Sequence, residues 1–211
     1  MFESYLDFFG AAVPYRCAFH PGDGVPDGLA PLPYHELYTG GVPKERAAAM
    51  LWRDDAALHV AALMEDSDVH SDAVGKNDRT WSKGDVMELF FQAAGHEDYV
   101  ELHLAPNLAT LELHFPSVAV LGKGALEDRF FDSGFKTATG LLPAASPVKG
   151  WWGRMDVPLE RIGGAAGLDG ARFSVCRYNY NQGWEKPEIS SCSRYPSGGF
   201  HQPQHWNTLK I

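Results

Sequence analysis

The stretch DYVELHLAPNLATLELHFP, residues 98–116, carries the pattern that decides the fold. Apolar and polar residues alternate over 99–104 and again over 110–115, and a two-residue period is typical of half-buried β-strands. Pro106 and Asn107 between the two runs are typical of a hairpin turn. The pattern predicts an antiparallel pair with one buried and one solvent-facing side. The expected buried side holds Val100, Leu102, Leu104, Leu111, Leu113 and Phe115; the expected polar side holds Tyr99, Glu101, His103, Thr110, Glu112 and His114.

Strand patterns recur along the rest of the chain, and we therefore predict an all-β fold, an antiparallel β-sandwich. Two short helices are also expected, one over Pro43 and the Ala-rich KERAAAMLW and one over LERIGG after Pro158. Residues 1–14 are predicted to form a strap or first edge strand, and residues 15–211 one domain. The further predicted strands are 15–19, 57–64, 86–92, 134–140, 151–158, 171–179 and 207–211.

Composition limits the classes of partner. The 211 residues are 45% hydrophobic, enough for one sizeable core, and the net charge is −9. A negative chain repels phosphates, which argues against nucleic acid and anionic membranes as partners. No run approaches the roughly 20 apolar residues of a membrane span. The N-terminal stretch carries Glu3 and Asp7 and lacks a basic segment, so we expect a cytoplasmic chain unless an export signal was removed.

Three cysteines, Cys17, Cys176 and Cys192, occur without a CxxC pair. A zinc ribbon or a thioredoxin-like site is therefore not indicated. We expect buried free thiols, with a single disulfide left open as an alternative.

The stretch WSKGDVMELFF, residues 81–91, places a carboxylate inside an apolar strand. Both faces of this strand are largely apolar, so it is predicted to be central in its sheet. Glu88 must then be paired or hydrogen-bonded, since an unpaired buried charge costs several kcal/mol. Arg177 in RFSVCRYN is the expected partner, and a role of Glu88 in ligand binding is the alternative.

The six tryptophans fall into different environments. Trp81 and Trp184 lie in polar, Gly-containing loops, where a flat ring could cover the C–H face of a sugar or could simply anchor the loop. Trp52, Trp151 and Trp152 lie within or beside predicted elements and are expected to pack in the core. The position of Trp206 is left open.

The order of several motifs resembles the family 9 carbohydrate-binding modules, within the wider group of DOMON-like β-sandwiches. The resemblance spans about residues 15–211 and implies a jelly-roll-like sandwich that binds sugars without cleaving them. The motifs are AALHVAALMEDSDVH, WSKGDVMELFFQ, DYVELHLAPN, GWWGRMDVPLERIG, RFSVCRYNYNQGW and FHQPQHWNTLKI.

The resemblance also implies a sugar site, a slot between two tryptophans that Trp81 and Trp184 match. The polar residues between them that match best are Glu88, Arg177, Asn179 and Asn181. The sequence thus predicts non-catalytic carbohydrate binding and no cofactor.

Three alternatives stay open. A small glycan-active enzyme would use a carboxylate pair that nothing in the sequence singles out, and no GxSxG, HExxH or P-loop motif occurs. A haem-binding DOMON module could use Met64 or Met155 with a histidine, although alternation alone explains His103 and His114 as surface residues. The acidic stretch EDSDVHSD, residues 65–72, could hold a structural calcium ion, with a solvated acidic turn as the plainer interpretation.

Overall fold

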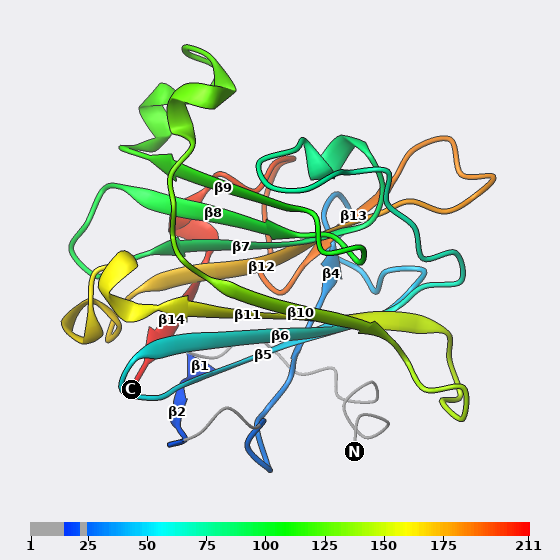
Figure 1. Cartoon of the computed structure of the whole chain (residues 1–211), viewed down its shortest axis with the longest axis horizontal. Coiled ribbons are helices and arrows are strands. Elements are labelled where there is room, and N and C mark those ends of the chain that lie inside the picture. Colours follow the sequence, from blue (N-terminus) through cyan, green and yellow to red (C-terminus); the bar gives the residue numbers. More distant parts are fainter. Residues whose placement is uncertain (1–14, 22–24) are drawn as a thin grey trace.

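A computed structural model describes residues 15–21 and 25–211. The predicted strap over residues 1–14 lies outside the described residues. Two β-sheets pack face to face, and their long strands run roughly along the horizontal axis of Figure 1. The all-β sandwich predicted from the sequence is confirmed. Most strand pairs are antiparallel, while β1–β14 and β2–β5 are parallel.

The larger sheet has the strand order β1-β14-β12-β7-β8-β9; in addition, β13 pairs with β12, and β4 pairs with β13. Its long strands carry most of the sequence motifs. The bounds are β1 Tyr15–Arg16, β4 His35–Glu36, β7 Val86–Gln92, β8 Tyr99–Leu104, β9 Thr110–Phe115, β12 Arg172–Asn179, β13 Glu188–Ser191 and β14 Asn207–Lys210.

The smaller sheet has the order β10-β11-β6-β5-β2, with β3 paired to β5. Its strands are β2 Ala18–Phe19, β3 Leu32–Pro33, β5 Ala47–Arg53, β6 Ala57–Glu65, β10 Lys136–Leu141 and β11 Gly150–Pro158.

Only 3₁₀ turns occur as helical structure in the described part of the chain, among them η2 Thr80–Ser82, η3 Val118–Val120, η4 Leu126–Arg129, η5 Leu159–Arg161, η6 Ala165–Gly167 and η7 Pro203–His205.

The helix predicted after Pro43 is wrong, because residues 47–53 form the strand β5. Ala49 and Leu51 of this strand face the other sheet, while Met50 and Trp52 pack under a second apolar layer on the outside. Since both faces are covered, the strand is apolar at nearly every position and does not alternate. Sheet pairing on both sides outweighs the helix propensity of its alanines. The turn after Pro158 is a short 3₁₀ helix, η5.

Two hydrophobic clusters flank the larger sheet. The inter-sheet core holds the residues of β7, β8 and β12 that face the smaller sheet, such as Leu89, Leu102 and Val175. The second cluster lies on the outer face and contains Phe90 and Trp206. Loops 117–131 and 195–206 cover this outer face, the former projecting at the upper left of Figure 1.

The predicted inside and outside of the 98–116 hairpin need correction. Leu102 pairs with Glu112 and His103 with Leu111, so the apolar residues of β9 share a face with the polar residues of β8. The outer loops bury that face, and Glu101 and His103 are only 6% and 0% exposed. The expected solvent-facing polar surface is therefore wrong for β8.

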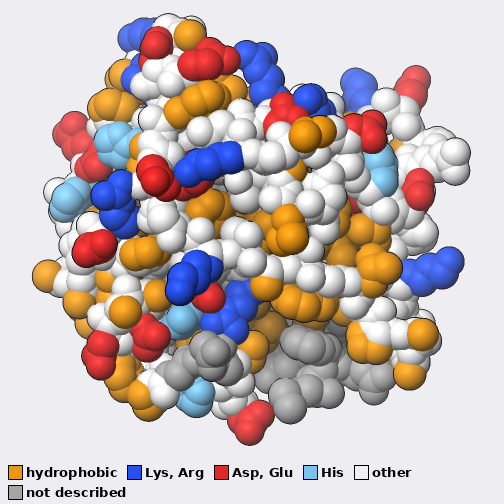
Figure 2. Space-filling model, in the orientation of Figure 1, with side chains coloured by type: hydrophobic (Ala, Val, Ile, Leu, Met, Phe, Trp, Pro, Cys, Tyr) orange, Lys and Arg blue, Asp and Glu red, His pale blue; other side chains and the backbone are white. Residues whose placement is uncertain are grey.

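Three further expectations can be compared with the structure. Trp52 and Trp151 are fully buried, as predicted for core residues, whereas Trp152 is only half-buried; Trp206 lies in the outer cluster. All three cysteines are free and buried. No helix in the described ranges is both long enough and apolar enough to span a membrane. On the face shown in Figure 2, acidic and basic side chains are interspersed with apolar ones.

Candidate functional site

A pocket of about 320 Å³ lies on the outer face of the larger sheet, between that face and its covering loops. Its floor comes from β7, β8, β9 and β12, and its rim from the η2 turn and the loops at 121–126 and 199–201. Aromatic rings and ionisable groups both line it. The lining residues are Trp81, Glu88, Phe90, Glu101, Leu113, Phe115, Leu121, Gly122, Leu126, Tyr178, Gly199, Phe200 and His201.

The η2 turn presents Trp81 at this pocket. The indole packs edge-on against the His103 imidazole with ring centroids 5.7 Å apart, and Thr80 Oγ1 lies 2.7 Å from His103 Nδ1. Gly84 closes the turn with φ of 136°, where a side chain would collide with the backbone of His70 and Ser71. Trp81 is therefore held by its neighbours and half-buried, with part of the ring left open.

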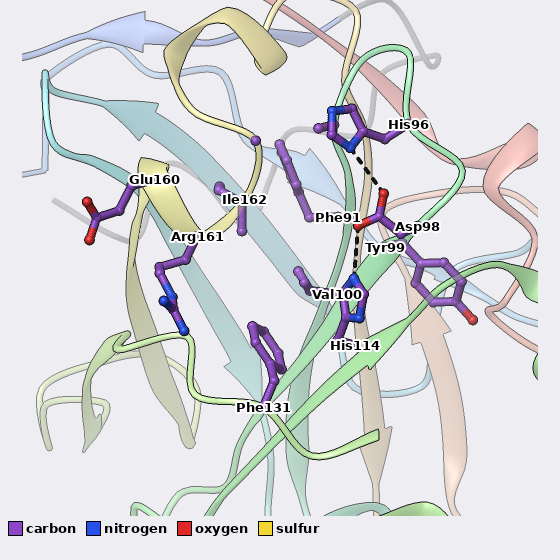
Figure 3. Close-up of a pocket in the computed structure, with 12 residues that line it drawn as sticks. Phe91, His96, Asp98, Tyr99, Val100, His114, Phe131, Glu160, Arg161 and Ile162 are labelled. Carbon is purple, nitrogen blue, oxygen red and sulfur yellow. Dashed lines mark hydrogen bonds and ion pairs between the residues drawn. The ribbon is translucent and has the colours of Figure 1, made fainter. Parts of the chain in front are cut away.

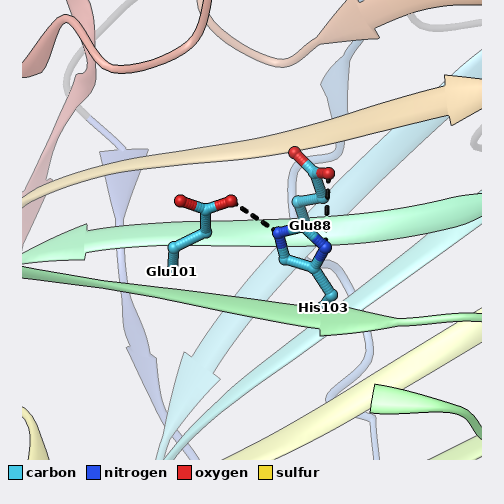
Figure 4. A group of neighbouring side chains, drawn as sticks. All are labelled: Glu88, Glu101 and His103. Carbon is cyan, nitrogen blue, oxygen red and sulfur yellow. Dashed lines mark hydrogen bonds and ion pairs between the residues drawn. The ribbon is translucent and has the colours of Figure 1, made fainter. Parts of the chain in front are cut away.

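Below Trp81, Glu88, His103 and Glu101 form a buried chain of charged groups. His103 lies between the two carboxylates, with its Nδ1 3.4 Å from Glu88 Oε1 and its Nε2 2.6 Å from Glu101 Oε1 (Figure 4). The chain continues through His201, whose Nε2 lies 3.5 Å from Glu101 Oε2 and whose Nδ1 lies 2.7 Å from the Tyr99 hydroxyl.

Burial shifts the proton affinities of this cluster. It raises the pKa of Glu88 to about 8, against the attraction of His103 and with help from the negative charge of Glu101. Burial disfavours the imidazolium of His103, but Glu88 and Glu101 outweigh it and raise the His103 pKa above its ordinary value. Burial lowers the pKa of His201. At neutral pH the site therefore retains protons between its carboxylates.

The expected Glu88–Arg177 pair does not form. Glu88 is the cross-strand partner of Cys176, so the next residue, Arg177, points to the opposite face of the sheet. Arg177 is fully buried there, and its Nη2 contacts Asp66 Oδ2 at 3.0 Å and Asn179 Oδ1 at 2.7 Å. Glu88 is thus paired with His103 and Arg177 with Asp66, and the sequence predicted neither pair.

The other predicted site residues, Arg177, Asn179, Asn181 and Trp184, are not among the lining residues of this pocket. Asn179 and Asn181 donate to Glu45 at 2.7 and 3.3 Å, and Asn181 also donates to Ser67. Lys44 Nζ lies 4.6 Å from the centroid of the Trp184 ring. The Tyr180 hydroxyl donates to the Trp81 carbonyl, which ties the loop of Trp184 to the η2 turn.

The acidic stretch 65–72 is engaged by protein partners. Asp66 is 1% exposed and pairs with Arg177, and Asp68 Oδ2 accepts from the Gln182 backbone N–H at 2.9 Å. A calcium ion would have to compete with these contacts. The Asp66 and Asp68 contacts therefore favour a protein-bound acidic loop, and structural calcium at 65–72 stays a prediction.

Two other pockets differ in chemistry. One of about 250 Å³ beside β8 and η5 holds Asp98 between His96 and His114, as Figure 3 shows. The other, of about 670 Å³, lies between loops 66–69 and 141–150 and has no aromatic ring among its described lining residues. The outer-face pocket alone among the three combines a tryptophan with buried hydrogen-bonding groups.

Sequence reasoning missed Glu101, His103, His201 and Tyr178 as site residues. Glu101 and His103 alternate with leucines like surface residues, and only the covering loops reveal their burial. Tyr99 on the same face was the available signal, because an aromatic ring buries a large apolar area when neighbouring side chains cover it, as Phe115 and Trp206 do here. His201 lies in the connection between β13 and β14, far in sequence from β8.

Comparisons with known proteins identify the fold. A protein from Bacteroides uniformis, provisionally described as carbohydrate-binding, aligns with a TM-score of 0.67 at 15% identity, over 94% of this chain and 99% of that one. A family 9 carbohydrate-binding module from Caldicellulosiruptor kristjanssonii with cellotriose aligns with a TM-score of 0.60 at 16% identity, over 92% of both chains. The same kind of module with glucose gives 0.57 at 16% identity, over 92% and 94%.

The likeness to family 9 carbohydrate-binding modules is therefore confirmed for the fold. At 15–16% identity it carries no residue roles with it. No protein-family model and no curated protein sequence matches the chain.

Proposed function

We propose that this protein binds carbohydrate without cleaving it, through the pocket on the outer face of the larger sheet. The observation that carries the proposal is the pairing of Trp81 with Glu88 and Glu101 in one cavity of about 320 Å³. A sugar ring has an apolar C–H face and a hydroxyl edge, so it needs an aromatic plane beside hydrogen-bonding groups. Solved structures of the same fold hold cellotriose and glucose, which supports this ligand class.

The charge of the pocket narrows the class of sugar. Its described lining residues include Glu88 and Glu101 but no lysine or arginine. A sugar carboxylate or sulfate placed there would meet the Glu101 carboxylate without a lysine or arginine to pair with. Neutral sugars, whose hydroxyls donate to carboxylate oxygens, are therefore the expected ligands.

The slot between two tryptophans is the finer form of the proposal. Trp81 would cover one sugar face, and Trp184 would approach from the loop that Tyr180 ties to the η2 turn. Trp184 is half-buried and has Lys44 against its ring, so it has few core contacts to lose. Trp184→Ala should weaken sugar affinity about tenfold or more, because burying an aromatic ring contributes roughly 1.5–3 kcal/mol. Its melting temperature should stay close to that of the wild type.

A glycan array probed with the wild-type protein tests the proposal and supplies the ligand. Neutral glucans or related neutral glycans should be retained, and uronic-acid or sulfated glycans should not. The retained glycan is then incubated with the protein and assayed for released reducing ends. Absence of binding to any neutral glycan would refute the proposed function, and steady release of reducing ends would identify a hydrolase instead.

A further inference from the structure

Glu88, His103 and Glu101 form a buried chain that continues to the partly exposed His201, and sugar binding does not require this composition. Each of Glu88, Glu101 and His103 offers a ligand atom, and these atoms all lie within 4.8 Å of one another. The side chains of Glu88, Glu101 and His103 are 2%, 8% and 1% exposed. Two acids and an imidazole so close together in a buried place form an unusual set for a strand face.

An unpartnered atom points to a missing ligand at this place. Glu101 is 6% exposed, and its Oε2 is buried with no hydrogen-bond partner. His201 Nε2 lies 3.5 Å from this oxygen, too far for a good hydrogen bond. A buried carboxylate oxygen without a partner is costly, so we expect a further hydrogen-bond donor or a cation to bind at this atom.

The two imidazoles are oriented as metal ligands usually are. His103 and His201 both direct Nε2 at Glu101, at 2.6 and 3.5 Å. Each also has its Nδ1 fixed by another group, Thr80 Oγ1 for His103 and the Tyr99 hydroxyl for His201, both at 2.7 Å. Outer hydrogen bonds of this kind set the tautomer and the ring angle of a ligating histidine.

We propose that Glu101, His103 and His201 bind a divalent transition-metal ion of the zinc class, with Glu88 orienting His103 from its far side. Imidazole with carboxylate is a ligand set that suits zinc and its neighbours, whereas calcium and magnesium prefer oxygen ligands alone. The inference goes beyond the proposed function and does not depend on sugar binding.

Both contacts of Glu101 fit the size of such an ion. Bonds of about 2.0–2.2 Å in a tetrahedral site separate ligand atoms by about 3.4 Å. The His201–Glu101 separation of 3.5 Å already matches this value. The His103–Glu101 contact of 2.6 Å would lengthen by less than about 1 Å as the ion replaces the shared proton.

Zinc titration into chelator-treated protein, followed by calorimetry, tests the inference without any sugar present. The wild type should bind one Zn²⁺ per chain. His201→Gln should weaken binding at least about tenfold by removing one ligand, and it should leave the fold intact because the His201 side chain is 31% exposed. Glu101→Gln should weaken binding by at least a similar factor and should abolish the rise in melting temperature that zinc produces.

His114→Gln is the matched control, because His114 pairs with an acid, Asp98, in the other histidine-lined pocket. It should bind zinc like the wild type. Three results would overturn the inference: no zinc binding by the wild type, equal binding by His201→Gln, or loss of binding in His114→Gln, which would place the ion at Asp98. Because Glu101 and His201 also line the proposed sugar pocket, zinc is titrated without sugar and the array is probed in chelator, so the two proposals fail separately.

Discussion

Glu88 is a residue whose need for a charged partner can be predicted from the sequence, whereas the identity of that partner cannot. A carboxylate within an apolar strand predicts a charged partner, and Arg177 is the nearest candidate by pattern. The partner is His103, because β8 lies beside β7 and pairs His103 with Glu88 in register. The pattern alone could show that a partner was needed, but only strand register decides which residue provides it.

The proton held by Glu88 makes stability depend on pH. Its folded pKa of about 8 lies above the ordinary value of about 4.3, so its favourable contribution is complete below pH 4.3 and is lost as the pH rises through 8. The raised pKa of His103 acts in the same direction. We expect the wild type to lose up to about 1.4 kcal/mol per pH unit for each proton in this range.

Glu88→Gln should flatten this loss, because the amide cannot ionise and His103 loses one of its anionic neighbours. Urea unfolding in chelator at pH 5, 6, 7 and 8 measures the difference, and Glu97→Gln, which removes an exposed carboxylate from the β7–β8 turn, is the control. Parallel stability profiles for the wild type and Glu88→Gln would show that Glu88 does not hold this proton.

At the scale of elements, the end of β12 is joined to distant loops by a buried ion pair. Arg177 contacts Asp66 from the end of β6, 111 positions away, and both side chains are fully buried. Asn179 and Glu45 extend the same network. This network fixes the relative position of loops 65–72 and 180–187, the second of which carries Trp184.

Removing one charge of this pair should be costly. Arg177→Met leaves Asp66 buried and without its charged partner, and we expect a loss of about 3–5 kcal/mol in the free energy of unfolding. Lys210→Met breaks an exposed pair with Asp169 at 3.9 Å and should cost at most about 1 kcal/mol. Denaturant unfolding of both variants measures these free energies. If Arg177→Met lost as little stability as Lys210→Met, the prediction would be wrong, and water would already solvate the Arg177 site.

Elements also show where sequence prediction succeeds. The runs at 57–64, 86–92 and 171–179 lie in β6, β7 and β12 because each is apolar, β-branched or aromatic and bounded by turn residues. The run at 47–53 was mistaken for a helix, because alanines carry helix propensity and a strand covered on both faces shows no alternation. β3, β4 and β13 are two to four residues long and are specified mainly by their pairing with longer strands.

At the scale of the whole molecule, a second apolar layer outside the larger sheet creates the site. The loops 117–131 and 195–206 place Leu126, Phe200 and Trp206 over β7 to β9 and turn a sheet face into a partly enclosed pocket. The family resemblance predicted Trp81 and Glu88 as site residues from one motif, and both line this pocket. It could not predict Glu101 or His201, because their meeting depends on how a distant loop folds back over the sheet.

The central claim is that the outer-face pocket holds the sugar against Trp81. Calorimetric titration with the best neutral oligosaccharide from the array tests this most directly, comparing the wild type, Trp81→Ala and Trp152→Ala. Trp152 is a half-buried tryptophan that packs with the outer cluster of the smaller sheet, so its loss should leave affinity unchanged. Trp81→Ala should weaken affinity about tenfold or more while remaining folded by circular dichroism. Unchanged affinity in a folded Trp81→Ala protein, or an equal loss in Trp152→Ala, would contradict the account.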